Sequence, residues 1–174
     1  MKAPSHHLGI HGGRHGAMTG RMMAEIERVL LDETPDAVLV YGDTNSTLAG
    51  ALAAVKLNIP VAHVEAGLRT GDLAEPFPEE LNRVLTTRLA ALHFPPTEGA
   101  RENLLGEGVP AGRITVTGNT GIDAVLWVAG ELAAGRLEAP AWPWNGQGRR
   151  LILVTAHRRE SFGPVMTANL RILR

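Results

Sequence analysis

The 174-residue sequence predicts an α/β protein built on a doubly wound parallel sheet. Short apolar runs alternate with amphipathic helical segments through short connections, which is typical of parallel sheets. Three of these runs also end directly in polar residues: 37–41 leads into Asp43, 60–64 into Glu65, and 151–155 into His157. Because ligands bind at the carboxyl ends of the strands in such sheets, the sequence predicts a polar site there.

The order of elements follows from hydrophobic periodicity. We expect a first helix from Met18, where apolar residues begin to recur at helical spacing, to the residues before Pro35. A strand at 37–41 and a strand at 60–64 enclose a helix rich in Ala and Gly, which can pack closely on a sheet. The later expected elements are a helix from near Glu79, a strand at 92–94, a helix capped by Thr97 and running to Leu105, a strand at 114–117, and a helix from Asn119 or Thr120 to Val128.

Residues 135–150 interrupt this pattern with several Pro and Gly residues and two Trp residues, and we expect them to form a linker. Residues 1–134 then form a first domain. Residues 151–174 offer one strand and one helix, which cannot bury a core alone, so we expect them to open a second domain.

The composition excludes several classes of protein. The formal net charge of −1 and the aromatic content of 4% give no case for nucleic-acid binding. The absence of cysteine excludes disulfides and thiolate zinc sites and suits a cytoplasmic protein. No apolar run is long enough to span a bilayer, so we expect no membrane association.

Several polar residues allow both a structural and a functional interpretation. Asp43 lies in a strand-to-helix turn, where it can cap the helix or present a carboxylate to a cleft. Glu79 can complement a helix dipole or belong to an active-site loop, in the same dense stretch as Arg69. Glu65 is harder to explain structurally, because an unpaired carboxylate directly after an apolar strand is costly if buried. His157 and Arg158 can form a solvated turn or contact phosphate.

No cofactor or metal is predicted. Four histidines near the start, at positions 6, 7, 11 and 15, lie in a Gly-rich segment without a helical pair, which argues against a metal site. The glycines do not form the dinucleotide-binding fingerprint.

Four segments carry a family resemblance: "VLVYGDTNSTLAGALAAVKLNIPVAHVEAGLRT", "PFPEELNR", "VTGNTGIDAVL" and "LVTAHRRESFG". In this order they resemble the non-hydrolysing UDP-N-acetylglucosamine 2-epimerases, over most of the chain from about Thr34. The resemblance implies two Rossmann-like domains in a GT-B-like architecture, with the active site between them. The family's leading strand with its Gly-Thr-Arg-Pro-Glu motif does not occur here, and most of the second domain is missing, so we expect a chain truncated at both ends.

The resemblance also implies an activity, the interconversion of UDP-GlcNAc and UDP-ManNAc by elimination of UDP and its re-addition through 2-acetamidoglucal. By motif position, Asp43, Glu65, Glu79 and His157 match catalytic residues, and Arg158 and Arg69 match substrate-binding residues. It implies a homodimer at full length and a role in making cell-surface polysaccharides. Two alternatives stay open: an inactive or nucleotide-sugar-binding fragment of such an enzyme, and a GT-B-like glycosyltransferase, which would not need so many acids.

Overall fold

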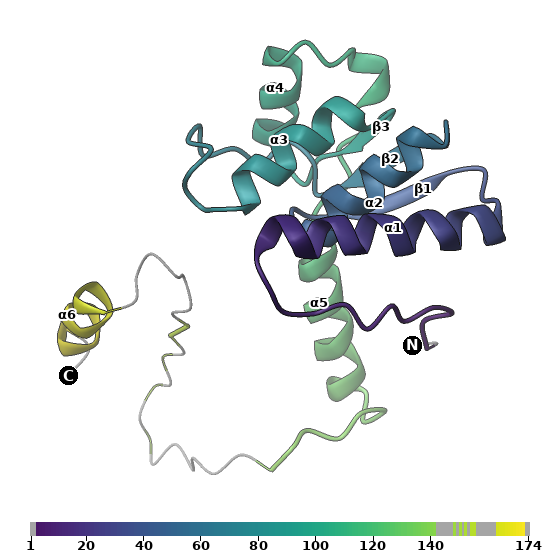
Figure 1. Cartoon of the computed structure of the whole chain (residues 1–174). Helices are drawn as coiled ribbons and strands as arrows, with labels where there is room; N and C mark the ends of the chain where they lie inside the picture. Colours follow the sequence, from purple (N-terminus) through teal and green to yellow (C-terminus); the bar gives the residue numbers. More distant parts are fainter. Residues whose placement is uncertain are drawn as a thin grey trace. The chain divides into compact units, whose positions relative to one another are not determined.

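The computed structural model describes residues 3–141, 148, 150, 152, 154–155 and 163–172, which fall into two compact units, 1–123 and 124–174. Figure 1 shows the elements of both. The first unit contains α1 (His15–Glu33), β1 (Val38–Tyr41), α2 (Asn45–Lys56), β2 (Val61–Val64), α3 (Glu79–Leu89), β3 (Leu92–Phe94), α4 (Glu98–Gly106) and a 3-10 turn, η1 (Ala111–Arg113). Helix α5 (Thr120–Ala133) runs across the division between the units, and α6 (Pro164–Ile172) belongs to the second.

The sheet has three parallel strands in the order β1-β2-β3, with α2 and α3 as the crossover helices. This arrangement confirms the predicted α/β class with a parallel sheet. Helix α2 is able to lie close to the strands because its inner positions are small: Ala51, Ala53 and Ala54 are buried in one core cluster with Val40 and Val61. Helix α1 packs against α2 and adds Leu30 to the same cluster.

The two faces of the sheet differ in burial. In one row of partners, Val40, His63 and His93 are all buried on the face that the crossover helices cover. Residues that alternate with them point to the opposite face, where Leu39 and Tyr41 are exposed, Leu39 by 68%. Among the described residues the sheet therefore has one packed face and one open apolar face.

Most expected boundaries are confirmed: β3 covers residues 92–94, α3 begins at Glu79, and Thr97 caps α4 by accepting a hydrogen bond from the N–H of Ala100 at 3.2 Å. The expected start of the first helix at Met18 is wrong, because α1 begins at His15.

The expected strand at residues 114–117 is also not formed as such. The segment runs alongside β3 with one isolated parallel bridge, between Ile114 and His93, and the N–H groups of Thr115 and Thr117 donate to carbonyls of His93 and Pro95. Pro95 has no N–H to return a bond to the ladder, so regular pairing stops after one step.

The expected strand at 151–155 falls partly outside the described residues, as do residues 142–147 of the expected linker. The predicted division into residues 1–134, 135–150 and 151–174 stays a prediction. Among the described residues, no helix combines the length and the apolar character needed to cross a bilayer.

Burial keeps two histidines neutral beneath the helices. Desolvation is the main cause that lowers the pKa of His63, and desolvation together with neighbouring His63 lowers the pKa of His93 to about 4. The Nε2 atom of His63 lies 2.8 Å from the Gly42 carbonyl, which can only accept, so this nitrogen carries the ring proton.

We predict that the protein loses stability as pH decreases, because of His93. Its pKa in the folded protein, about 4, lies below the value of about 6.5 in the unfolded chain, so the unfolded state binds the extra proton between these values. The free energy of unfolding should be intact above about pH 6.5 and decline by on the order of 3 kcal/mol as pH approaches 4. Urea titrations over this range should show a shallower pH dependence for His93→Gln, whereas His7→Gln, at an exposed position, should follow the wild type. Equal slopes in all three proteins would contradict the prediction.

We predict a sharp difference between two glycines with positive φ in the loop after β2. A Cβ at Gly67 (φ +82°) would overlap the Ala100 carbonyl oxygen and lie 2.9 Å from Leu104 Cγ, whereas Gly71 (φ +84°) has nothing within 4 Å. Gly71→Ala should cost about 1–2 kcal/mol of unfolding free energy from the left-handed backbone alone. Gly67→Ala should cost roughly 1–3 kcal/mol more, because the packed helix α4 has to shift. Chemical denaturation of both variants measures this difference, and similar losses would refute it.

Candidate active site

The turn after β1 is fixed by hydrogen bonds that continue the sheet beyond its last paired residues. The N–H of Gly42 donates to the carbonyl of Val64 at 3.0 Å, and the carbonyl of Gly42 accepts from His63 at 2.8 Å. Gly42 has a φ of +70°, which glycine adopts without steric cost. Gly42, directly before Asp43, is thereby bonded to β2 through both its N–H and its carbonyl.

Glu65 lies at the equivalent point of the neighbouring strand. Its N–H donates to the carbonyl of Phe94 at 3.0 Å, and its φ is +65°, an uncommon conformation for a residue with a Cβ. A Cβ built on Gly42 would lie 3.6 Å from Glu65 Oε2, so the carboxylate leans toward the turn that carries Asp43. A strained backbone at a strand end is a frequent property of functional sites.

Asp43 does not cap α2. The cap is Thr44, whose hydroxyl accepts from the N–H of Thr47 at 3.3 Å. The carboxylate of Asp43 instead lies 3.4 Å from Nη2 of Arg83, with 33% of the side chain exposed. The structural interpretation of Asp43 as an N-cap is therefore excluded, and its carboxylate is directed toward α3.

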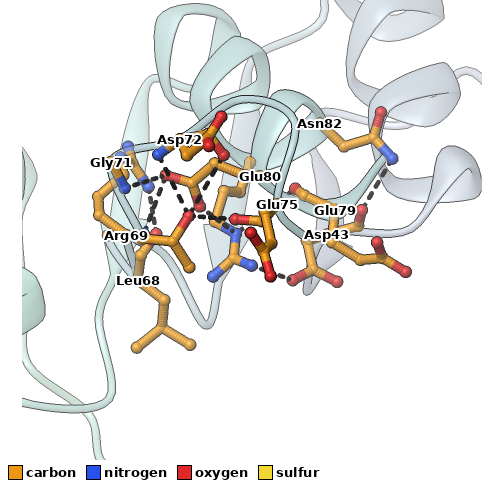
Figure 2. A network of polar contacts seen from close by, with 12 residues as sticks. Asp43, Leu68, Arg69, Gly71, Asp72, Glu75, Glu79, Glu80 and Asn82 are labelled. Atoms are coloured by element: carbon orange, nitrogen blue, oxygen red, sulfur yellow. Dashed lines mark hydrogen bonds and ion pairs between the residues drawn. The ribbon is translucent and has the colours of Figure 1, made fainter. Parts of the chain in front are cut away.

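Helix α3 carries a network of polar contacts at its first turn (Figure 2). Glu80 is only 1% exposed; its Oε1 accepts from the N–H groups of Thr70 and Gly71 at 3.0 and 3.2 Å, and its Oε2 lies 3.1 Å from Arg83 Nε. Asn82 donates to the backbone carbonyl of Asp43 at 2.9 Å. The helix therefore fixes both the loop after β2 and the turn after β1.

Glu79 is the first residue of α3 and is partly buried. Its backbone carbonyl accepts from Arg83 Nε at 3.4 Å, and the same guanidinium reaches Asp43. In Figure 2 the side chains of Glu79 and Asp43 lie on the same side of the network. The structure thus groups Asp43, Glu65 and Glu79 around the ends of β1 and β2 and the start of α3.

Arg69 is directed elsewhere. It is 11% exposed and donates to Glu107 at 3.0 Å, to the hydroxyl of Thr87 at 2.8 Å and to the carbonyl of Leu68 at 2.7 Å. These contacts give Arg69 a role in joining α3 to the end of α4. Its predicted role in substrate binding stays a prediction.

The remaining predicted site residues, His157 and Arg158, lie outside the described residues. Three residues with clear roles in the network were not among the predicted catalytic or binding residues: Glu80, Asn82 and Arg83. The signal that could have found two of them is the i, i+3 spacing of Glu80 and Arg83 on one helix, which permits an ion pair.

The described residues contain no group of three or more side chains that could hold a metal ion. Two of the N-terminal histidines have other partners: His6 lies 2.6 Å from Glu33, and His15 lies 3.0 Å from Asn45.

Comparison with known proteins shows the family to which this chain belongs. The model of the family described as UDP-N-acetylglucosamine 2-epimerase matches residues 1–174. The chain belongs to this family. A UDP-N-acetylglucosamine 2-epimerase of Salmonella typhimurium is 53% identical over 150 residues, which are 84% of this chain and 40% of the relative.

Two further relatives bear on the ligand. The crystal structure of the Methanocaldococcus jannaschii UDP-GlcNAc 2-epimerase, in complex with UDP-GlcNAc and UDP, is 54% identical and superposes with a TM-score of 0.70 over 73% of this chain and 34% of that one. A UDP-2,3-diacetamido-2,3-dideoxy-D-glucuronate 2-epimerase of Pseudomonas aeruginosa is 48% identical over 91% of this chain and 43% of its own length. The chain therefore spans about 40% of the length of the curated relatives it matches.

We predict that Arg69 acts mainly on stability. Arg69→Met leaves Glu107, 24% exposed, without its cation, and should lower the unfolding free energy by about 2 kcal/mol, below the 3–5 kcal/mol of a fully buried pair. Arg101→Met is the control, because its partner Glu102 is 66% exposed and such pairs contribute about 0–1 kcal/mol. Urea denaturation measures both. Unchanged stability of Arg69→Met together with loss of UDP binding would support the substrate-binding role instead.

Proposed function

We propose that this chain supplies the N-terminal-domain side of the active site of a UDP-GlcNAc 2-epimerase, which interconverts UDP-GlcNAc and UDP-ManNAc. The observation that carries the proposal is the convergence of Asp43 and Glu65 at the ends of two adjacent parallel strands, in a chain that belongs to this family. Strand ends at this edge are the usual ligand-binding position in open α/β sheets.

The reaction inverts one carbon of the sugar without a net redox change. A base takes the proton from C2, the C2–H electron pair forms the C1–C2 double bond, and the C1–O bond breaks so that its electron pair leaves with UDP. Addition of a proton to the opposite face of C2 and attack of the UDP oxygen on C1 then give the epimer. The reaction needs acid and base groups near both faces of C2 and cations near the diphosphate.

The described residues supply the acid and base groups. Asp43, Glu65 and Glu79 are carboxylates of the candidate active site, and each is at least partly accessible. In the proposed mechanism they handle the C2 proton, and His157 and Arg158 complete the site at the leaving group and the nucleotide. The two-domain GT-B-like arrangement, the homodimer and the cytoplasmic location are parts of this proposal.

A second substrate has support from one relative. The Pseudomonas aeruginosa enzyme acts, by its name, on UDP-2,3-diacetamido-2,3-dideoxy-D-glucuronate, and its similarity covers 91% of this chain. The 2-epimerisation is the same reaction on a sugar with a C3 acetamido group and a C6 carboxylate. Incubation with both UDP-sugars in parallel separates the two, and we expect UDP-GlcNAc to be the better substrate.

The test places all 174 residues in a chimera, where they replace the matching part of the Salmonella typhimurium relative, and uses deuterated water. We expect deuterium at C2 and formation of UDP-ManNAc. Asp43→Asn, Glu65→Gln and Glu79→Gln should each reduce turnover roughly 10²–10⁴-fold, because each removes a general acid or base, and should spare UDP binding. Glu102→Gln, on the exposed face of α4, is the control that should keep full turnover. A folded chimera that exchanges no deuterium would overturn the proposal, and normal turnover of all three variants would remove these carboxylates from the mechanism.

A further inference from the structure

We infer that Arg83 is a positioning residue that holds the Asp43 carboxylate in its working orientation, with Glu80 as the buried counter-charge of Arg83. The inference rests on the proposed function, because it assigns Arg83 a role in the reaction that Asp43 carries out.

The guanidinium of Arg83 lies between two carboxylates. Its Nε lies 3.1 Å from Glu80 Oε2, and its Nη2 lies 3.4 Å from Asp43 Oδ2, with only 10% of the side chain exposed. The N–H of Nε is donated to the backbone carbonyl of Glu79 at 3.4 Å. Since the guanidinium is planar, this hydrogen bond and the ion pair with Glu80 together set the direction in which Nη2 points. The first turn of α3, through the carbonyl of Glu79 and the carboxylate of Glu80, therefore directs one nitrogen of Arg83 toward Asp43 (Figure 2).

The two carboxylates have different environments. Glu80 is 1% exposed and its Oε1 is bonded to two backbone N–H groups, so it has little freedom to move and no access to a ligand. Asp43 pairs with Arg83 through Oδ2 while a third of its side chain remains exposed. This asymmetry is what a positioned acid or base requires, since one part of the carboxylate is restrained and another part stays open to substrate.

The backbone and the side chain of Asp43 are restrained by different residues. Asn82 bonds the backbone carbonyl of Asp43 at 2.9 Å, and the fold of the turn is also tied to β2 through Gly42. These contacts do not involve Arg83. Loss of the Arg83 contact should therefore release the carboxylate of Asp43 and leave the turn in place.

The variants must avoid a trivial loss of folding. Arg83→Met alone leaves Glu80 as an uncompensated buried charge, which is strongly destabilising. The informative pair is therefore Glu80→Gln and Glu80→Gln/Arg83→Met, which differ only at Arg83. In both, the amide oxygen of Gln can accept the bonds from Thr70 and Gly71. Arg83→Lys keeps the charge but replaces the planar fork with a single ammonium, which cannot hold both carboxylates in the same way.

The first readout is the χ1 angle of Asp43, measured by three-bond couplings in the isotopically labelled 174-residue protein. We expect one rotamer in the wild type and in Glu80→Gln, and averaging over rotamers in Glu80→Gln/Arg83→Met and in Arg83→Lys. Arg28→Met, which removes an exposed arginine of α1, is the matched control and should leave the couplings unchanged. Unchanged Asp43 couplings in both Arg83 variants would overturn the inference.

The second readout is turnover in the chimera. We expect kcat of Glu80→Gln/Arg83→Met to fall about 10²-fold relative to Glu80→Gln at unchanged KM, because misplacement of a catalytic group by about 1 Å has an effect of this size. A rise in KM at constant kcat would overturn the inference and make Arg83 a substrate contact. Equal kcat in an active chimera also overturns it while the proposed function stands, whereas an inactive wild-type chimera is a failure of the proposed function itself.

Discussion

The parallel pairing of β1 and β2, extended by one residue at its carboxyl end, is the constraint on which the candidate active site depends. The pairing continues through Gly42, which donates to Val64 and accepts from the buried imidazole of His63. Because both strands end at the same level, the residues that follow them are neighbours although they are 22 positions apart in sequence. Asp43 and Glu65 come together for this reason, and the positive φ values of Gly42 and Glu65 are the backbone conformations that this meeting requires.

Helix α3 stabilises these two strand ends through side chains of its first turns. Three positions of its first turns act on two segments. Glu80 binds the loop at Thr70 and Gly71, while Asn82 and Arg83 contact the backbone and the side chain of Asp43. Burial of Glu80 and Arg83 is costly for each charge alone, and the pair offsets that cost through mutual attraction and backbone hydrogen bonds. His93, buried on β3, ties the stability of the first unit to pH through its neutral state.

Much of the fold could be predicted from the sequence, because its signals are local. The apolar run before Asp43 and the run before Glu65 predicted parallel strands, and Thr97 predicted a helix start, since capping depends on a residue and the three that follow it. The strand expected at 114–117 could not be judged in this way, because regular pairing depends on its neighbour, and Pro95 of that neighbour lacks the N–H that a ladder needs.

The sequence predicted which carboxylates lie in the candidate site, but not the ion pairs that hold the neighbouring side chains. The strand-end position of Asp43 and Glu65 followed from the general rule for parallel sheets. The ion pair of Arg69 could not be predicted in this way, because its partner Glu107 is 38 residues away and no local pattern links the two residues. The ion pair of Arg83 with Asp43 was likewise hidden, since it spans two elements that only the tertiary fold brings together.

The most direct test of the central claim is an NMR measurement of the contact between the two strand ends in the 174-residue protein. The account predicts NOEs between the Hα protons of Gly42 and the side chain of Glu65, since a Cβ at Gly42 would lie 3.6 Å from Glu65 Oε2, together with slow exchange of the Gly42 amide that donates to Val64. Absence of these NOEs, with rapid exchange of that amide in a protein whose β1 and β2 are otherwise protected, would show that the strand ends do not meet and would contradict the account.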